Sequence, residues 1–216
     1  MSTAVFRRKS MEYSLGNPCI PEHVAIHRFG LKMVPLNEEH HESLAHMLAD
    51  DNLWKGGFGG GLDCKPETFE GLMGFVKNMI ATPDHISYAI FNSSGLLVGT
   101  TSIVDFDDEE ETCTLGRTFL GHEHWGKGYS RTSKDILIDL AFRHGWRSVW
   151  AFIDSRNTES LNSVKKIGFV HTRNSYRPQF DKDGTPKEVR LYEVYPHSWI
   201  RSPLSVDEGD VVNSMA

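Results

Sequence analysis

The second half of the chain carries the clearest pattern of apolar and polar positions. Three segments have strand character: residues 86–91, 96–106 and 112–120. A Ser-Ser-Gly turn and an acidic segment separate them, which predicts an antiparallel β meander. Apolar residues then recur at every third or fourth position from about Tyr129 to Arg143, as in an amphipathic helix that ends before Gly145.

A second strand and helix follow. Val149–Ile153 has the length of a short buried strand, and the next helix is expected from about Thr158 to Ile167, with Gly168 as its C-terminal glycine. Another strand begins at Phe169. A last hairpin is expected, with its tip at Asp183-Gly184 and a return strand at about 189–194.

The first half predicts one strand and two helices. Strand spacing covers residues 24–36, with an interruption allowed at Gly30, and Asn37 is a suitable N-cap for the first helix. Pro66 fits the first turn of the second helix. The glycine-rich segment 56–61 between these helices predicts a mobile loop, either a part of a substrate gate or a simple linker. The order of elements implies a mixed α/β sheet with helices on both faces.

The length of 216 residues suits one domain with extensions. We expect the domain at 23–202, an irregular N-terminal arm at 1–22 and a disordered acidic tail at 203–216. No apolar run is long enough for a membrane span, and the N-terminus lacks the apolar centre of a secretory signal, which together favour a cytoplasmic protein without a membrane partner. The three cysteines form no C-x-x-C pair and suggest neither a disulfide framework nor a structural zinc site.

The charge balance bears on possible partners. A net charge of -6 and a pI of about 6.0 make a nucleic-acid-binding face unexpected, because such faces need clustered Lys and Arg. A cationic or small neutral partner fits better. The acidic run 107–111 could attract a basic substrate, but it also has the character of a solvated hairpin tip.

A glycine turn precedes the long helix. Gly126-Lys127-Gly128 stands directly before Tyr129. Glycines at a helix start let a ligand approach the unpaired N–H groups at the positive end of the helix dipole. The turn therefore predicts an anion site that suits a phosphate, although the same pattern also occurs as plain loop chemistry.

Two nucleotide-binding interpretations of this turn are weaker. Residues 121–127 match the spacing G-x-x-x-x-G-K of a P-loop NTPase, but Gly128 stands where that loop needs Ser or Thr to hold magnesium. The segment also follows a meander rather than the first strand of a parallel sheet. A dinucleotide-binding fold would need a third glycine where Arg131 stands.

Several segments together resemble the GNAT superfamily of N-acetyltransferases. The turn resembles its R/Q-x-x-G-x-G/A loop, in which backbone amides hold the pyrophosphate of coenzyme A. The spacing of further segments is similar to the branch that acetylates N-termini of ribosomal proteins, the RimJ and RimL type. These segments are Leu115–Leu120, Trp125–Tyr129, Lys134, Ala141-Phe142, Asn157-x-x-Ser160 and Lys166–Phe169. The resemblance covers roughly residues 35–199.

The resemblance implies a GNAT-type mixed, mostly antiparallel central sheet of six to seven strands flanked by helices. It also implies an enzyme that moves an acetyl group from acetyl-CoA to a primary amine by direct attack in a ternary complex, without a metal. The strand Thr118-Phe119-Leu120 would supply backbone groups to the pantetheine and an N–H near the thioester oxygen. Asn157 would bind the pantetheine arm, and Ser160 would protonate the thiolate.

The pyrophosphate would lie at the turn itself. The resemblance assigns it to Gly126, Lys127, Gly128, Tyr129 and Ser130, with Arg131 close enough to assist as a charge. For Asn157 and Ser160, helix capping is the structural alternative, and it is compatible with ligand binding.

Three positions depart from the family pattern. Glu123 stands at the Gln or Arg that begins the loop, Thr114 replaces a glutamate common on the preceding strand, and Gln179 and then Asp181 stand near a glutamate that some relatives use as a base. The general base is therefore open between His122, His124, Asp181 and water. At pH 7 a lysine amine is neutral in roughly one molecule in several thousand and a peptide α-amine in roughly one in ten, so the lack of a strong base favours an α-amine.

The acceptor amine is open as well. Relatives of this type acetylate protein N-termini, free amino acids, polyamines, aminoglycosides and peptide-like toxins. A homodimer through the N-terminal arm is one possibility. The main alternative to an enzyme is a catalytically silent module that binds acyl-CoA, because the usual carboxylates are missing.

Overall fold

The computed structural model of the protein describes residues 17–80, 85–174, 179–180 and 184–201. The tail expected at 203–216, most of the arm expected at 1–22, and Asp181 lie outside the described residues. The last part of the arm is described, and it packs against the protein's own fold: Cys19 N–H donates to His144 O over 3.0 Å, and Trp146 Nε1 donates to Cys19 O over 3.0 Å.

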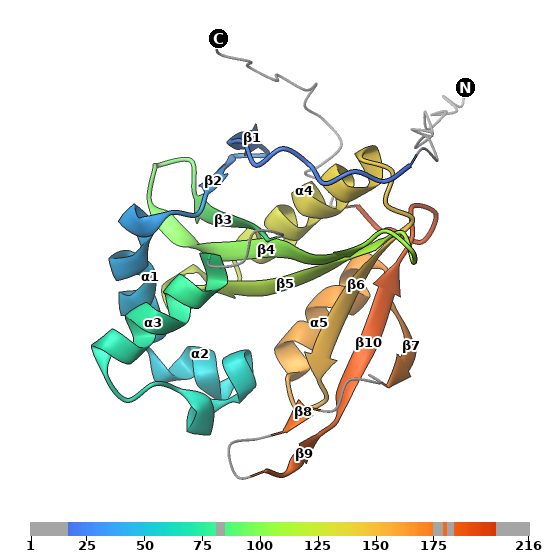
Figure 1. The fold of residues 1–216 in the computed structure, drawn as a ribbon. Coiled ribbons are helices and arrows are strands. Elements are labelled where there is room, and N and C mark those ends of the chain that lie inside the picture. Colours follow the sequence, from blue (N-terminus) through green and yellow to red (C-terminus); the bar gives the residue numbers. More distant parts are fainter. Residues whose placement is uncertain (1–16, 81–84, 175–178, 181–183, 202–216) are drawn as a thin grey trace, which may run out of the picture.

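An eight-stranded sheet in the order β1-β2-β3-β4-β5-β6-β10-β7 forms the centre of the molecule (Figure 1). Every neighbouring pair is antiparallel except β5 and β6, which are parallel. The strands of this sheet are β1 (Ile26–Arg28), β2 (Leu31–Pro35), β3 (Ile86–Phe91), β4 (Leu97–Asp107), β5 (Thr112–Leu120), β6 (Ser148–Asp154), β7 (Val170–Asn174) and β10 (Val189–Val194). β8 (Gln179–Phe180) and β9 (Pro186–Lys187) form a separate two-stranded sheet.

The mixed, mostly antiparallel sheet is confirmed, with eight strands rather than six or seven. The extra strand arises because the segment expected as one strand at 24–36 folds back on itself as the β1–β2 hairpin. Phe29 and Gly30 form its turn, with φ of 52° and 72°. Two consecutive residues with positive φ are typical of a tight hairpin turn.

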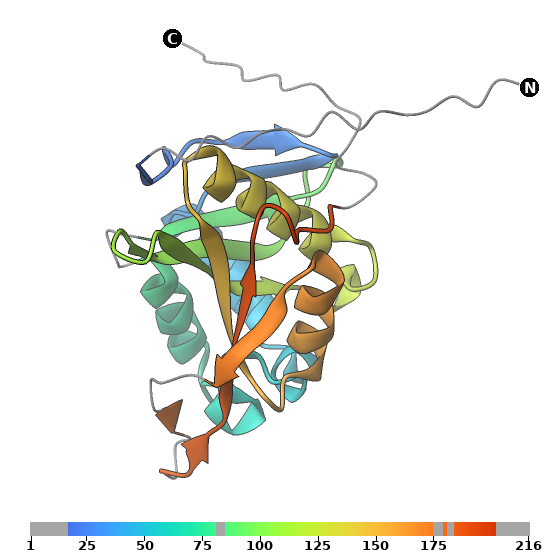
Figure 2. The ribbon, with the colours of Figure 1, turned by 90° about the vertical axis from the view of Figure 1, so that its right-hand side faces the viewer.

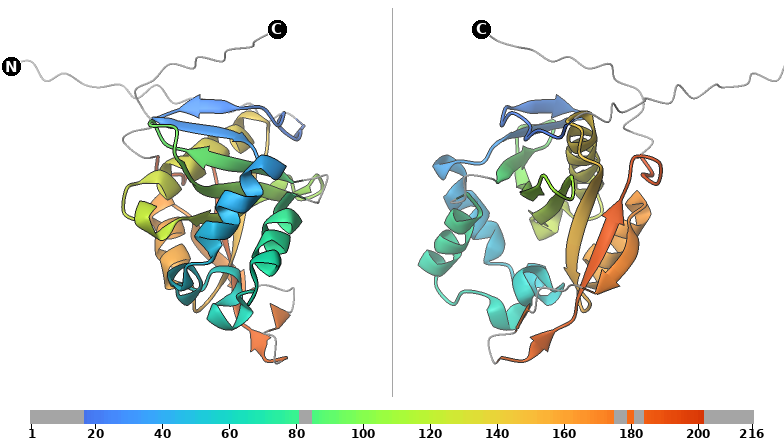
Figure 3. Two further views of the ribbon diagram at one scale, coloured as in Figure 1. Left: turned by 90° about the vertical axis from the view of Figure 1, so that its left-hand side faces the viewer. Right: turned by 45° about the vertical axis from the view of Figure 1, so that its right-hand side comes forward.

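Helices cover both faces of the sheet. They are α1 (His41–Leu48), α2 (Asp51–Lys55), α3 (Phe69–Ile80), α4 (Tyr129–Arg143) and α5 (Thr158–Ile167). Figure 2 shows α4 and α5 on the side of the sheet opposite α3, and the left panel of Figure 3 looks onto the face that α1 and α3 cover. Each face has its own core: Ile136 and Leu137 of α4 lie in one buried cluster, and Leu44 of α1 and Val76 of α3 lie in the other.

Two helical features differ from expectation. The helix expected from Pro66 begins at Phe69, and the short helix α2 was not expected from the sequence. In the glycine-rich segment, residues 58–60 form a 3₁₀ turn. Gly59 permits close packing there, because a Cβ at this position would lie 2.6 Å from the Trp54 ring.

The feature that shapes the site is the divergence of β5 and β6. They pair only from Thr112 and Ser148 to Thr114 and Trp150, and beyond this point the strands separate (Figure 1). Among the described strands, the rest of β5 therefore has a neighbour, β4, on one side only.

Candidate active site

A cavity of about 810 Å³ opens where β5 and β6 separate. Residues 115–120 of β5 and 151–154 of β6 line it, together with the start of α4, one face of α5 and residues 56–60. Of the residues expected to hold the cofactor, all but Lys127 line this one cavity, and Asn157 and Ser160 line it too. Lys127 is exposed.

A bulge interrupts β5 inside the cavity. Thr100 pairs with Phe119 and Ser102 with Gly116, so Thr101 alone stands opposite both Arg117 and Thr118. Arg117 has a φ of 51°, which is unusual for a residue other than glycine. A bulge leaves a residue out of the hydrogen-bond ladder, so it exposes backbone polar groups of β5 to the cavity.

The start of α4 offers an anion site. Its N-cap, Gly128, has a φ of 85° and provides no side-chain cap. In the part of the chain that the structure describes, none of the backbone N–H groups from Gly126 to Arg131 donates a hydrogen bond within the protein. The dipole of this 15-residue helix adds positive potential at the same place.

The charge of Arg131 is directed into the protein. Its Nε lies 3.0 Å from Asp135 Oδ2, and its guanidinium also donates to the backbone oxygens of Lys166 and Ile200. Arg131 lines the cavity, but it is held by an ion pair and two carbonyls rather than left available to a ligand.

Lys134, one turn further along α4, is a site residue whose chemical role the sequence reasoning missed. Only 7% of its surface is exposed, and it lines the cavity. Its Nζ donates to Ser163 Oγ over 2.8 Å. Burial, followed by the nearby charge of Arg131, lowers the pKa of Lys134 from 10.5 to about 8. The sequence signal that could have found it is the position of this lysine on the apolar face of its helix.

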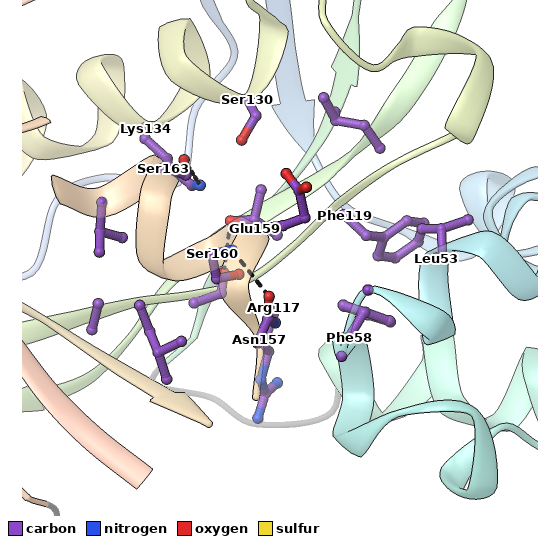
Figure 4. A pocket seen from close by; sticks show the side chains of 18 of the residues that line it. Leu53, Phe58, Arg117, Phe119, Ser130, Lys134, Asn157, Glu159, Ser160 and Ser163 are labelled. Atoms are coloured by element: carbon purple, nitrogen blue, oxygen red, sulfur yellow. Dashed lines mark hydrogen bonds between the residues drawn. The ribbon is translucent and has the colours of Figure 1, made fainter. Parts of the chain in front are cut away.

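At the start of α5, Asn157 caps the helix and also lines the cavity. Asn157 Oδ1 accepts a hydrogen bond from Ser160 N–H over 3.0 Å, which leaves the Asn157 amide N–H groups free of that contact (Figure 4). The Ser160 hydroxyl forms no hydrogen bond with another described residue, and it lines the cavity. Gly168 ends the helix with a φ of 98°, as the sequence predicts.

The structure separates the groups considered as general base. His122 does not line the cavity, and its Nδ1 lies 3.6 Å from Asp50 Oδ2. His124 is buried and lines the cavity, and it lies in the 3₁₀ turn that precedes the glycine turn of α4. Figure 4 shows a carboxylate that sequence reasoning had not singled out, that of Glu159, which points into the cavity between Ser130 and Phe119.

Two of the positions that depart from the family pattern, Glu123 and Thr114, do not line the cavity. The Glu123 carboxylate lies 3.3 Å from His124 Nε2 and does not line the cavity, so its negative charge is not directed at the N–H groups before α4. Thr114 is buried where β5 pairs with Val104 of β4 and with Trp150 of β6. Gln179 belongs to the separate sheet of β8 and β9.

Comparison with known proteins identifies the family. The family model of the acetyltransferase (GNAT) domain matches residues 31–170. The chain belongs to the GNAT acetyltransferase family. Members of this family use acetyl-CoA, and the uncapped N–H groups of the α4 turn, the bulged β5 and the long cavity fit that molecule.

Solved structures share the fold of this GNAT acetyltransferase. A GCN5-related N-acetyltransferase from Brucella melitensis aligns with a TM-score of 0.74 at 16% identity, over 85% of this chain and 84% of the other. A probable GNAT acetyltransferase from Chromobacterium violaceum has a TM-score of 0.71 at 17% identity, over 84% and 96%. Spermidine N-acetyltransferase from Vibrio cholerae, in complex with CoA and spermine, has a TM-score of 0.61 at 15% identity, over 78% and 97%. A search of curated proteins found no match.

The P-loop alternative loses its support. β5 is antiparallel to β4, and the loop after it lies inside the matched GNAT domain rather than after the first strand of a parallel sheet. Within the described ranges no group of three or more His, Cys, Asp or Glu side chains is arranged to hold a metal ion. No helix in the described part of the chain is long and apolar enough to cross a bilayer.

Proposed function

We propose that this GNAT acetyltransferase moves the acetyl group from acetyl-CoA to a primary amine, which attacks directly in a ternary complex. The observation that carries the proposal is one continuous cavity from the uncapped start of α4, along the unpaired side of β5, to the first turn of α5. Such a cavity suits a long ligand with phosphates at one end and a reactive thioester further along. A silent acyl-CoA-binding module has the same cavity and differs only in turnover.

Each task of the reaction has a residue in this arrangement. The backbone of Thr118–Leu120 holds the pantetheine and directs an N–H at the thioester oxygen, where negative charge develops. The N–H groups of Gly126–Arg131 bind the diphosphate. Asn157 donates from its amide to the pantetheine arm, and Ser160 gives its hydroxyl proton to the departing thiolate.

Glu159 is the group that we assign to accept the proton of the amine. Its carboxylate lines the cavity beside Ser160 and accepts no hydrogen bond from another described residue. Among the described residues, Asp154 is the other carboxylate in the lining. Arg156 lies 2.6 Å from it, and hydrogen bonds from that arginine lower the pKa of Asp154. Asp154 is therefore a weaker base than a free carboxylate.

A Glu159→Gln variant tests this assignment. We expect kcat/KM to fall about 100-fold, with loss of the acidic limb of its pH profile, because the amide cannot accept a proton. An unchanged acidic limb would show that water or another group takes the proton. A Glu67→Gln variant, which changes the same charge at an exposed position outside the cavity, serves as the control.

The lining of the cavity favours an amine with little other positive charge. Phe58, Phe75 and Phe119 form one aromatic cluster, with the Phe58 ring 5.8 Å and 5.2 Å from the other two. Arg117 and Lys187 add positive charge. Like charges repel, so a peptide α-amine or another singly charged amine suits this lining better than a polyamine. A protein N-terminus, the substrate type of the RimJ and RimL branch, belongs to the favoured class.

The proposal is tested by thiol release from acetyl-CoA across a panel of amines. The panel contains short peptides with free N-termini, the same peptides with blocked N-termini and a free lysine, single amino acids, spermidine and an aminoglycoside. We expect release with free N-termini and little with spermidine. CoA binding without release for any acceptor would favour the silent module, and strong turnover of spermidine would refute the argument from the lining.

A further inference from the structure

The cavity contains a buried positive charge that the fold does not neutralise. In the described residues, Lys134 forms no ion pair with a carboxylate, and Ser163 Oγ is the single hydrogen-bond acceptor of its ammonium. An ammonium has three donors, so two remain without a partner among the described residues. Burying a charge without an opposite charge is costly, and such lysines are retained where they have a ligand or a reaction to serve.

The neighbouring charged groups do not relieve this cost. Arg131 on the same helix repels Lys134 and is itself paired with Asp135. From α5, Glu159 and Lys166 face the same cavity, and from the sheet Arg117 of β5 and Asp154 of β6 face it. Among all these groups, only the charge of Arg131 clearly shifts the pKa of Lys134, and it lowers it.

Lys134 also lies close to the uncapped N–H groups. It follows Ser130 by four residues, so the two side chains are neighbours on one face of α4, with Cβ atoms about 5–6 Å apart. Both line the cavity, and Figure 4 shows Ser130, Lys134 and Ser163 along one side of it. A ligand anion at the start of α4 is therefore within reach of the ammonium.

We propose that the Lys134 ammonium binds a phosphate oxygen of acyl-CoA, held in position by Ser163. This inference rests on the proposed function and adds a specific residue to it: the diphosphate is bound by a buried charge as well as by backbone N–H groups. Ser163 acts as a positioning residue, since its hydroxyl oxygen accepts a hydrogen bond from the ammonium and orients it.

A coupling between binding and protonation follows. In the ligand-free protein the pKa of Lys134 is lowered to about 8, chiefly by burial. A bound phosphate stabilises the charged form and raises that pKa, so CoA binding takes up a proton in the range of pH above 8. Affinity for CoA therefore falls as the pH rises from about 8 toward 10.

Isothermal titration calorimetry of the whole chain with CoA and with acetyl-pantetheine tests the proposal. Titrations at about pH 8.5 in two buffers of different ionisation enthalpy measure the protons taken up. We expect uptake with CoA and none with acetyl-pantetheine, which lacks phosphates. This comparison uses the unaltered protein, so it does not depend on whether a variant folds.

Three variants complete the test. Lys134→Met should weaken CoA binding roughly 10- to 100-fold, abolish proton uptake and leave acetyl-pantetheine binding unchanged. Ser163→Ala should weaken CoA binding by a smaller factor and retain the uptake. Lys32→Met removes an equal charge from the exposed face of β2 and should change neither quantity.

The two proposals fail in different ways. If the unaltered protein binds no CoA, the proposed function fails and the role of Lys134 fails with it. If the protein binds and turns over acetyl-CoA but Lys134→Met retains full affinity and proton uptake, the role of Lys134 is refuted and the acetyltransferase proposal stands. Equal losses for CoA and acetyl-pantetheine would show that Lys134 shapes the cavity without binding phosphate.

Discussion

Replacement of Lys134 by methionine should stabilise the ligand-free protein at neutral pH. A pKa lowered from 10.5 to about 8 means that folding destabilises the ammonium by about 3 kcal/mol relative to the neutral amine, compared with the unfolded chain. Methionine has a similar length and no charge, so it removes this cost and loses the hydrogen bond to Ser163, which is worth about 1 kcal/mol. We expect a net gain of about 1–3 kcal/mol in the free energy of unfolding at pH 7.

The dependence of this gain on pH identifies its cause. Between pH 8 and 10.5 the unfolded chain holds the Lys134 proton while the folded chain has lost it, so the unfolded state binds more protons there. The stability contribution of Lys134 therefore rises with pH across this window and is constant below it. The advantage of the methionine variant should be largest at or below pH 8 and should shrink toward pH 10.

Urea denaturation followed by tryptophan fluorescence, at several values between pH 7 and 10, measures both effects. Other groups titrate in the same range; burial, for example, raises the pKa of Tyr88 to about 12. The difference between the two proteins cancels such shared contributions. A difference in unfolding free energy that is constant with pH would refute a buried ammonium, and a large loss of stability at pH 7 would show that the lysine is needed for folding.

Three further changes test the site. Ser160→Ala should lower kcat about 100-fold with little change in CoA affinity, and an unchanged kcat in steady-state assays would exclude the acid role. Asn157→Asp should keep the helix cap and weaken CoA binding, whereas Asn157→Ala should also cost about 1 kcal/mol of stability in denaturation experiments. Gly128→Glu should abolish CoA binding, whereas the control Gly95→Glu should not. The two glycines have φ of 85° and 79° and open space at Cβ, so glutamate causes similar backbone strain at both positions, and only Gly128 lies at the cavity.

Much of the fold could be predicted from local sequence patterns that are compatible with only one kind of secondary structure. The bounds expected for β3, β5 and α4 agree with the structure, because each has a regular period that ends at a turn or glycine. Gly168 was recognised as a helix end, and the structure adds that a Cβ there would lie 2.1 Å from Ser198 O. That close contact joins residues thirty positions apart, so no local pattern could have predicted it.

The sequence was less informative where tertiary contacts override local preference. The β1–β2 turn places Phe29 at positive φ, a conformation that its residue type does not suggest. The glycine-rich segment gave no indication that its Phe58 packs against Phe75 and Phe119 in the cavity wall. Glu123 was recognised as irregular from the sequence, but only the structure shows that it faces His124.

The placement of charge around α4 explains why a glycine turn alone is a poor guide to function. Uncapped N–H groups attract any anion, and the acidic and basic residues before and after the turn do not alter that. Glu123 faces away from it, and Arg131 is paired with Asp135. Lys134 differs because it is buried, lacks an ion-pair partner among the described residues and lies in the same cavity. Water and salt screen a buried charge little, so its contribution should favour a ligand whose phosphates enter the cavity over one that meets only the exposed turn. Selection of CoA at this turn then depends on the depth of the cavity that β5 and β6 create as much as on the glycines.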